Sequence, residues 1–357
     1  MAELKWNDRV RLEDVREWIA SSIPDSRKVE GPITIFRSND WGITASFHVY
    51  NGHSVQEVVC KIAFLPIFQS SPAIYTALSQ LNSGAVPVYI NGKTEDGLTW
   101  LLFEKFSGHL IREEANLNAL IDIAKQMADL QKQFTPIANE HAIPYYSLRH
   151  LAVQLPVFVE HAKNVYRPQW TAQQEQLIKN NLDGKEDLLA ICDAGILDRM
   201  ASAMAELCGQ LDGFSLPYSI DHLDLHSNNA IRTKGGEVIV FDFEEAVISC
   251  PLFSLEKLLD EAAEFENSYS GHKHKIQWSA AQLQLRDAYL LALDPNVRND
   301  RLITMFDYMA AVAPIKYAYQ SSYFLEQVGS QHMEAELMAE SFVKAWKRIA
   351  QLELNKG

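Results

Sequence analysis

The chain has 357 residues, of which 47% are hydrophobic and 22% charged, and this composition excludes a disordered, collagen-like or coiled-coil protein. With 46 acidic and 32 basic residues the net charge is −14, so we expect no nucleic acid as a partner, because phosphate backbones bind clustered lysine and arginine. At this length, two domains or lobes are expected.

The cysteines and the N-terminal segment point to a cytoplasmic protein. The four cysteines include no CxxC pair and are too few for a disulfide scaffold, so reduced thiols are expected. Residues 1–10 lack the apolar core of a signal peptide, and the long uncharged run at 62–92 contains three prolines. We therefore expect no membrane-inserted segment.

The first part of the chain is β-rich after one helix. Apolar residues at helical spacing predict this helix over residues 9–21. Runs of β-branched and aromatic residues predict strands after Gly31, and Asn51-Gly52 between two of them is a strong hairpin signal. A short helix is expected at 71–81. The predicted strands are 33–37, 42–50, 55–63, 86–90 and 98–106.

From about residue 115 the pattern becomes helical. The predicted helices are 115–134, 149–163, 172–183, 187–211, 254–267, 279–293, 299–325 and 333–353. One strand pair, 229–233 and 237–243, interrupts them and is joined by Gly235-Gly236. These patterns predict an α+β protein with a small β-rich lobe, 1–105, and a large mostly helical lobe, 106–357. Residues 1–105 carry 10 basic and 12 acidic side chains, so most of the negative charge lies in the helical lobe.

Residues 222–229 carry the most informative motif. They read His-Leu-Asp-Leu-His-Ser-Asn-Asn and fit His-x-Asp-Leu-x-x-x-Asn, the catalytic-loop pattern of kinases. Phosphoryl transfer to a hydroxyl needs a carboxylate beside the nucleophile, which predicts Asp224 as the catalytic base, with His222 bracing the loop. Asn229, together with Asp242 at the end of an apolar strand, supplies the hard oxygen ligands that Mg²⁺ prefers.

The β-rich lobe supplies candidates for nucleotide binding. Lys61 follows an apolar strand and is expected to reach the α- and β-phosphates. Upstream, Asn39, Gly42 and Thr44 belong to a turn between two predicted strands, where a single glycine allows close backbone approach to phosphates. In the order turn, lysine, catalytic loop and strand-end aspartate, these residues predict a nucleotide site.

These motifs together resemble the aminoglycoside phosphotransferase and choline kinase family of small-molecule kinases. The family writes its loop His-Gly-Asp-Leu-His-x-x-Asn, from which this chain differs mainly by Leu223, and His226 separates the family from most protein kinases. The family's next motif, an Asp followed by a residue pair and Ala, is matched at Asp242–Ala246. The similarity covers most of residues 31–260.

The resemblance implies a two-lobe protein-kinase-like fold and the phosphorylation of a hydroxyl on a small molecule. ATP or GTP is the implied phosphoryl donor, with Mg²⁺, and residues 1–105 become the nucleotide-binding lobe. It also implies that the segment containing Glu104 and Phe106 presents backbone groups to the adenine edge. Acidic residues of the helical lobe such as Glu256 and Asp260 favour a cationic acceptor: an aminoglycoside, an amino sugar or an amino alcohol.

Two departures from the family pattern leave alternatives open. Ser254 replaces an aspartate that the family carries after the metal-binding residue. Residues 62–92 contain no acid to hold Lys61, so Lys61 either pairs with Glu57 on the same strand, is held differently, or moves on nucleotide binding. A nucleotide-binding pseudokinase or sensor without turnover is therefore one alternative. A metallohydrolase that uses the histidines of the 222–229 motif as metal ligands is a weaker one.

Overall fold

The computed structural model describes residues 6–24, 28–52, 54–81, 83–138, 142–179, 186–265, 278–294, 300–328 and 331–354. It forms two compact units that alternate along the chain. The first unit consists of Met1–Ala115, Pro136–Pro144 and His226–Ala246, and the second of Asn116–Thr135, Tyr145–Leu225 and Val247–Gly357. The division into lobes at residue 105 stays a prediction.

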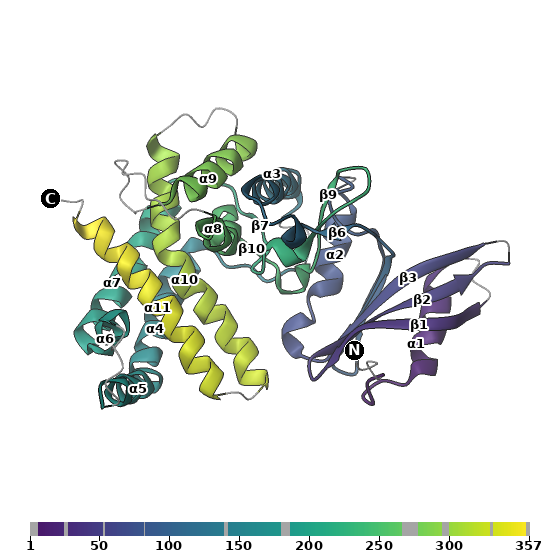
Figure 1. Cartoon of the computed structure of the whole chain (residues 1–357), viewed down its shortest axis with the longest axis horizontal. Helices are drawn as coiled ribbons and strands as arrows, with labels where there is room; N and C mark the ends of the chain where they lie inside the picture. The colour runs from purple at the N-terminus through teal and green to yellow at the C-terminus, as the bar shows by residue number, and fades with distance from the viewer. Residues whose placement is uncertain are drawn as a thin grey trace. The chain divides into compact units, whose positions relative to one another are not determined.

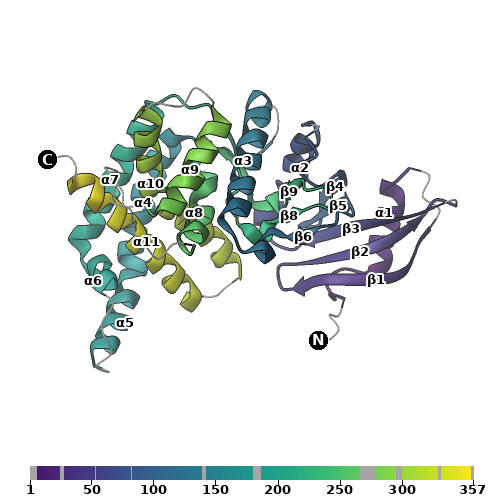
Figure 2. The same ribbon diagram turned by 45° about the horizontal axis from the view of Figure 1, so that its top comes forward.

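The first unit is built on a five-stranded antiparallel sheet in the order β1-β2-β3-β5-β4 (Figures 1 and 2). Its strands are β1 (Lys28–Asn39), β2 (Gly42–Tyr50), β3 (Val55–Ala63), β4 (Tyr89–Glu95) and β5 (Leu98–Glu104). The bounds of β2 and β3 are those predicted, and the predicted hairpin at Asn51-Gly52 joins them. The register pairs Tyr50 with Val55 across this turn, as expected of a hairpin at Asn-Gly.

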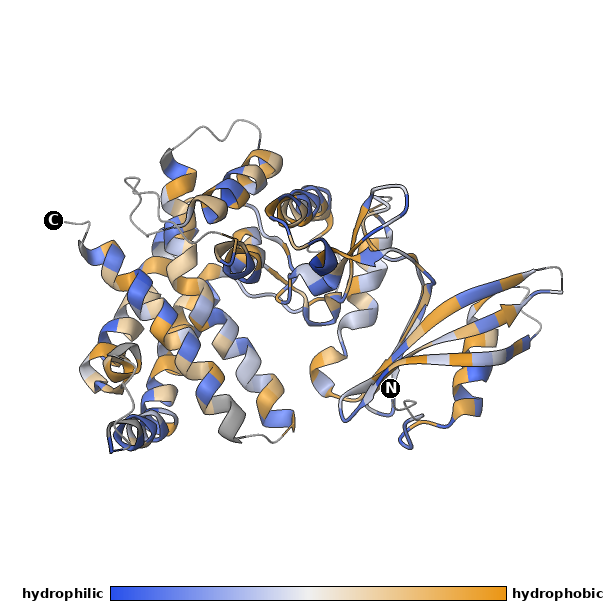
Figure 3. Ribbon diagram, viewed as in Figure 1, coloured by the Kyte–Doolittle hydropathy of each residue, from blue (hydrophilic) through white to orange (hydrophobic). Residues whose placement is uncertain are grey.

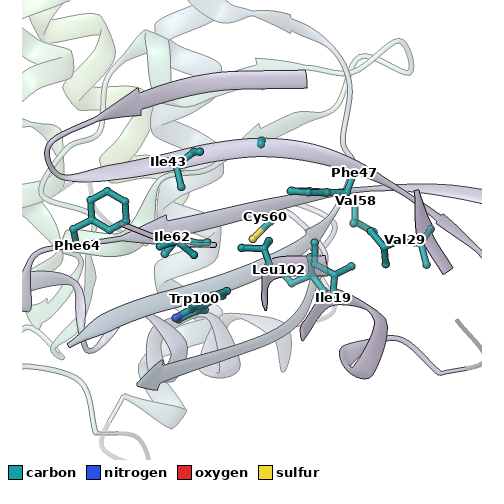
Figure 4. Close-up of a cluster of buried hydrophobic side chains, with 14 residues drawn as sticks. Ile19, Val29, Ile43, Phe47, Val58, Cys60, Ile62, Phe64, Trp100 and Leu102 are labelled. Carbon is teal, nitrogen blue, oxygen red and sulfur yellow. The ribbon is translucent and has the colours of Figure 1, made fainter. Parts of the chain in front are cut away.

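One face of this sheet is covered by α1 (Leu12–Ser22). The side chains of Val15 and Ile19 are fully buried, and the Trp18 ring meets Trp100 edge-on with the ring centroids 5.4 Å apart. Figure 4 shows Ile19 among side chains from β1, β2, β3 and β5. Because each large apolar side chain contributes roughly 1.5–3 kcal/mol on burial, this layer holds the sheet rigid.

The first unit also contains α2 (Ser71–Ser79) and a small three-stranded sheet in the order β6-β8-β9. Its strands are β6 (His109–Leu110), β8 (Ala230–Arg232) and β9 (Val238–Val240). The predicted strand pair therefore exists, and its register places Ala230 opposite Val240. This hairpin belongs to the same unit as Lys61, although it lies far along the chain.

The second unit consists of helices and one short strand pair (Figures 1 and 2). The helices are α3 (Leu117–Phe134), α4 (Leu148–Val165), α5 (Arg167–Lys179), α6 (Glu186–Cys192), α7 (Ala194–Asp212), α8 (Glu256–Ala263), α9 (Ala280–Leu293), α10 (Asp300–Val328) and α11 (Gln331–Leu354). Hydrophobic and hydrophilic residues alternate along them (Figure 3), as expected of helices that bury one face. None of the described helices is both long and apolar enough to span a membrane.

The strand pair of the second unit is formed by β7 (Ser219–Asp221) and β10 (Val247–Ser249), which are antiparallel. The sequence patterns did not predict these strands, because three residues are too few to show a period of two. The helix predicted at 187–211 is also two helices. The Asp193 carboxylate accepts the Gly195 N–H and caps a new helix at that point.

We expect Gly42→Ala to destabilise the protein by about 1–3 kcal/mol, because a Cβ at this position would lie 2.8 Å from the Ile62 carbonyl oxygen of the neighbouring strand. Gly209→Ala is the matched control: it lies within α7, has open space around it, and should stabilise the protein by about 0.5–1 kcal/mol. Calorimetric melting of both variants measures the difference. A Gly42 variant as stable as wild type would contradict the tight contact between β2 and β3.

Candidate active site

Lys61 on β3 is held by two carboxylates of the first unit. Its Nζ lies 2.5 Å from Asp242 Oδ1 and 2.7 Å from Glu244 Oε1. Burial alone would lower the pKa of Lys61, but the two carboxylates outweigh it and raise that pKa above its ordinary value. The lysine is therefore a fixed positive charge whose position is set by Asp242 and Glu244.

The expected pairing of Lys61 with Glu57 is wrong. Residues four apart on a strand share a face but lie about 13 Å apart along it, which is too far for an ion pair. Glu57 instead pairs with Lys105, with 2.5 Å between Lys105 Nζ and Glu57 Oε1, where the Lys105 N–H also donates to the Glu57 carbonyl at 3.1 Å. Glu244 lies within the Asp242–Ala246 motif, but nothing in the sequence indicated that it holds Lys61.

Helix α2 holds the carboxylates in place although it carries no acidic residue. Asp242 follows β9 with φ of 69°, a left-handed conformation that aspartate tolerates, and the chain then turns through 243–245. The Phe243 N–H donates to the Tyr75 hydroxyl at 3.0 Å, and Ser71 Oγ lies 3.2 Å from the Glu244 carbonyl oxygen. The missing helix acid is thus replaced by an acid from the turn that the helix supports.

Glu244 is almost completely buried, and this shapes its chemistry. Burial is the main cause that raises the pKa of Glu244 well above its usual range, and the neighbouring Asp242 carboxylate adds to it. Lys61 acts in the opposite direction. Glu244 Oε2 is buried without a hydrogen-bond partner among the described residues.

A cavity of about 330 Å³ opens beside this lysine, entirely within the first unit. Its volume lies within the range of small-molecule sites. The lining combines cations with aromatic rings, as a ligand with phosphates and a flat base requires. The lining residues are Phe36, Arg37, Thr44, Val59, Lys61, Tyr75, Pro87, Phe103, Lys105, Phe106, Phe241, Asp242 and Glu244. Arg37 is a second candidate for phosphate contact, which the sequence did not single out.

The predicted nucleotide contacts occupy different places around this cavity. Thr44 and Phe106 line it, whereas Glu104 is exposed and its N–H donates to the Val88 carbonyl at 2.9 Å. Asn39 Oδ1 accepts the N–H groups of Trp41 and Gly42, at 3.2 and 3.1 Å, and so closes the turn between β1 and β2. The roles of these residues toward a nucleotide stay predictions.

Asn229 is brought beside Asp242 by the β8–β9 hairpin. The Phe241 N–H donates to the Asn229 carbonyl at 2.9 Å, so Asn229 lies across the hairpin from Phe241. Phe241 directly precedes Asp242 in the chain. An amide and a carboxylate oxygen fit Mg²⁺, which takes one or two protein ligands and completes its shell with phosphates and water. The donor set therefore suits this metal.

The loop with Asp224 belongs to the second unit and follows β7. Asp224 is partly exposed and forms an ion pair with Lys257 of α8. His222 is fully buried, and its Nδ1 accepts the Asp224 N–H at 3.3 Å. The ring contact thus fixes the backbone of Asp224. The sequence did not single out Lys257, whose ammonium group occupies one side of the Asp224 carboxylate.

The acidic residues of α8 are neutralised within the second unit. Glu256 is buried, with Arg348 Nη1 2.8 Å and Lys344 Nζ 2.5 Å from its Oε1. Burial would raise the pKa of Glu256, but these two cations outweigh it and lower the pKa. Asp260 also pairs with Lys344. Glu256 and Asp260 therefore do not form an uncompensated negative wall.

A comparison of the sequence with models of known protein families identifies the family of this chain. The model of the phosphotransferase enzyme family (APH) matches residues 41–299, which include β2, β3, the loop with Asp224 and the turn with Asp242. The chain belongs to this family. No curated protein sequence matches it significantly.

Solved structures share the fold of this phosphotransferase at low sequence identity. Choline kinase from Cryptosporidium parvum Iowa II is 12% identical with a TM-score of 0.55, covering 97% of this chain and 99% of that one. Aminoglycoside phosphotransferase from Alicyclobacillus acidocaldarius is 15% identical with a TM-score of 0.52, covering 98% and 99%. A thermostable mutant of aminoglycoside phosphotransferase APH(4)-Ia, in a complex with ADP and hygromycin B, is 14% identical with a TM-score of 0.50, covering 94% and 98%. The expected kinase-like fold is confirmed.

In this phosphotransferase we expect Glu244→Gln to lower the free energy of unfolding by about 1–3 kcal/mol, because it replaces a buried carboxylate beside Lys61 with a neutral amide. Glu57→Gln is the matched control. Its pair with Lys105 is partly exposed, so the loss should stay below about 1 kcal/mol. Chemical denaturation compares the two; a larger loss for the Glu57 variant would contradict the assignment of Glu244 as the anchor.

Proposed function

We propose that the protein transfers the terminal phosphoryl group of ATP, or of GTP, to a hydroxyl of a small molecule. The observation that carries this proposal is Lys61, fixed between Asp242 and Glu244 beside a cavity with aromatic and basic walls. In this family position, a lysine held by carboxylates aligns the phosphates of a nucleotide. The cavity walls then receive the base and sugar.

Asn229 and Asp242 are the residues proposed to hold Mg²⁺. When bound there, the metal would neutralise charge on the phosphates. The chain's own groups act around it: Lys61 orients the phosphates, and the left-handed backbone at Asp242 presents that carboxylate to the cavity.

Asp224 is proposed to orient the acceptor hydroxyl and to take its proton as the new P–O bond forms. Its partly exposed carboxylate is accessible to an acceptor. Four residues lie between it and Asn229, and a chain that advances five positions spans at most about 18 Å, which limits how far the base can be from this metal ligand.

The two features that favoured a pseudokinase each have a structural replacement. Glu244 holds Lys61 in place of a helix acid. Ser254 Oγ accepts the His222 N–H at 3.1 Å and donates to Asp221 Oδ1 at 2.9 Å, so the loop before Asp224 is supported without the family's aspartate. Both replacements favour an active phosphotransferase over an inactive one.

The acceptor is proposed to be a cationic small molecule such as an aminoglycoside, an amino sugar or an amino alcohol. Support comes from the net negative charge of residues 106–357 and from neighbours described as choline kinase and as aminoglycoside phosphotransferase. Since Glu256 and Asp260 are paired, any attraction arises from the field of the whole lobe.

The two aspartates should separate by their effect on nucleotide binding. Asp224→Asn should lower turnover on the order of 10²–10⁴-fold while nucleotide still binds, because this residue faces the acceptor. Asp242→Asn should lose both turnover and Mg-nucleotide binding. Thermal shift with ATP or GTP plus Mg²⁺ measures the difference, because a ligand that binds only the folded state stabilises it by about RT ln(1 + [L]/Kd).

Wild type is the control for this experiment, and it should respond to nucleotide only when Mg²⁺ is present. Normal turnover by Asp224→Asn would remove the assignment of the base. A wild-type protein that no nucleotide stabilises would remove the kinase function altogether.

A cationic acceptor should lose kcat/KM as ionic strength rises, because screening weakens long-range attraction to the negative lobe. A neutral hydroxyl compound is the control, and its kcat/KM should stay flat. The measurement is a coupled ADP-release assay from about 50 to 500 mM salt, which shortens the screening length from about 14 to 4 Å. Equal salt profiles, or a preference for the neutral acceptor, would exclude the cationic class.

A further inference from the structure

Leu223, the residue immediately before the proposed base, has a left-handed backbone. Its φ is 64°, and its side chain is buried. A bulky L-residue adopts this conformation only against a steric cost, and such residues persist where the surrounding structure over-determines them. The groups that hold Leu223 in this conformation therefore also determine where Asp224 lies.

The N–H groups of residues 222, 223 and 224 are each engaged. The His222 N–H donates to Ser254 Oγ at 3.1 Å, and the Leu223 N–H lies 3.4 Å from Asp221 Oδ1. The Asp224 N–H donates to His222 Nδ1 at 3.3 Å. Ser254 Oγ in turn donates to Asp221 Oδ1 at 2.9 Å. Asp221 Oδ1 thus accepts the Leu223 N–H directly and is linked to the His222 N–H through the Ser254 hydroxyl.

The charge of Asp221 is compensated from α10. Asp221 and Lys316 are both fully buried, with 2.5 Å between Lys316 Nζ and Asp221 Oδ2. Lys316 Nζ also donates to Gln320 Oε1 at 2.9 Å and lies over the Phe253 ring, 4.8 Å from its centroid. A buried carboxylate without such a partner would be costly, so the ion pair with Lys316 compensates for the burial of Asp221 beneath the loop.

The support extends to the neighbouring elements. Gln131 of α3 donates through Nε2 to the Ile220 carbonyl at 2.9 Å and lies 3.2 Å from Ser254 Oγ, while its Oε1 accepts the Tyr289 hydroxyl at 2.5 Å. Asp221 itself is paired across the sheet with Val247. The carboxylate therefore has little freedom to move, as a group that fixes a strained loop requires.

We propose that Asp221, Ser254 and Lys316 form a positioning network that holds Leu223 left-handed and so presents Asp224 to the acceptor. This inference rests on the proposed function of Asp224. The negative charge that the family places at position 254 is supplied here by Asp221, one position before the catalytic loop. None of the three residues is expected to touch substrate, and their effect passes through the backbone of residues 222–224.

The first test removes the network without adding bulk. Ser254→Ala and Lys316→Met should each lower kcat by about 10–100-fold, because misplacing a reacting group by about 1 Å costs on the order of 10²-fold. The KM for nucleotide should change less than about twofold, since its proposed contacts lie in the first unit. The assay is steady-state ADP release with the acceptor that wild type turns over best. Wild-type kcat in both variants would overturn the proposal.

The second test asks whether the network acts by holding a strained residue. Glycine adopts positive φ without steric cost, so Leu223→Gly should make kcat less sensitive to the loss of Ser254 Oγ. Combined with Ser254→Ala, it should recover at least about fivefold of the lost kcat. If the double variant is no faster than Ser254→Ala, the network does not act through Leu223.

Arg348→Met provides a matched control, because it breaks another buried ion pair of the second unit, with Glu256, that takes no part in the proposed network. It should lower the melting temperature, and Leu223→Gly should rescue none of any kcat that it loses. A kcat loss in Arg348→Met that Leu223→Gly rescues would show that the rescue is not specific, and would overturn the proposal.

Amide hydrogen exchange separates this inference from the proposed function. In Ser254→Ala, exchange of the residue 222–224 amides should accelerate more than about tenfold, while β2 and β3 stay as protected as in wild type. This readout needs no turnover. Faster exchange in a protein without kinase activity would support the network and refute the function, whereas unchanged exchange would refute the network even in an active enzyme.

Discussion

A charged side chain that is buried away from water needs a partner of opposite charge, and both parts of the candidate site contain such a buried pair. In the first unit Lys61 is held by Asp242 and Glu244. In the second unit Asp221 is held by Lys316. Each pair joins segments that are distant in sequence, and removing one member of a buried pair costs far more than the pair contributes. The two pairs thus act as fixed points, and the strand-end turn and the loop are placed relative to them.

The same requirement explains which parts of the site the sequence could reveal. Lys61, Asp224, Asn229 and Asp242 were identified because the chemistry needs their side chains at fixed local spacings. The anchor of Lys61 stayed open in the sequence, and Glu57 was one candidate because it lies on the same strand. The partner that the structure shows, Glu244, lies 183 positions away, and only the fold brings it close.

The fold shows a similar division between local and distant information. The hairpin of β2 and β3 was predicted to the residue because Asn51-Gly52 and the two alternating strands agree with one another. The strands β7 and β10 were missed, although β7 leads directly into the loop with Asp224. Three residues that pair only with a distant segment leave no periodic signal. The least predictable elements are therefore those that support the candidate base.

The two left-handed residues beside the site show how differently the same backbone conformation can be supported. Asp242 tolerates it at low cost, because a short polar side chain is the kind most often found there, and its carboxylate is engaged by Lys61. Leu223 has no such tolerance; its N–H donates to Asp221 Oδ1, which also accepts a hydrogen bond from Ser254 Oγ. A glycine at position 223 would adopt this conformation with fewer supporting hydrogen bonds. Leu223 and the buried Asp221–Lys316 pair are then explained together: the residue with the higher cost of positive φ is the one supported by a buried ion pair and its hydrogen bonds.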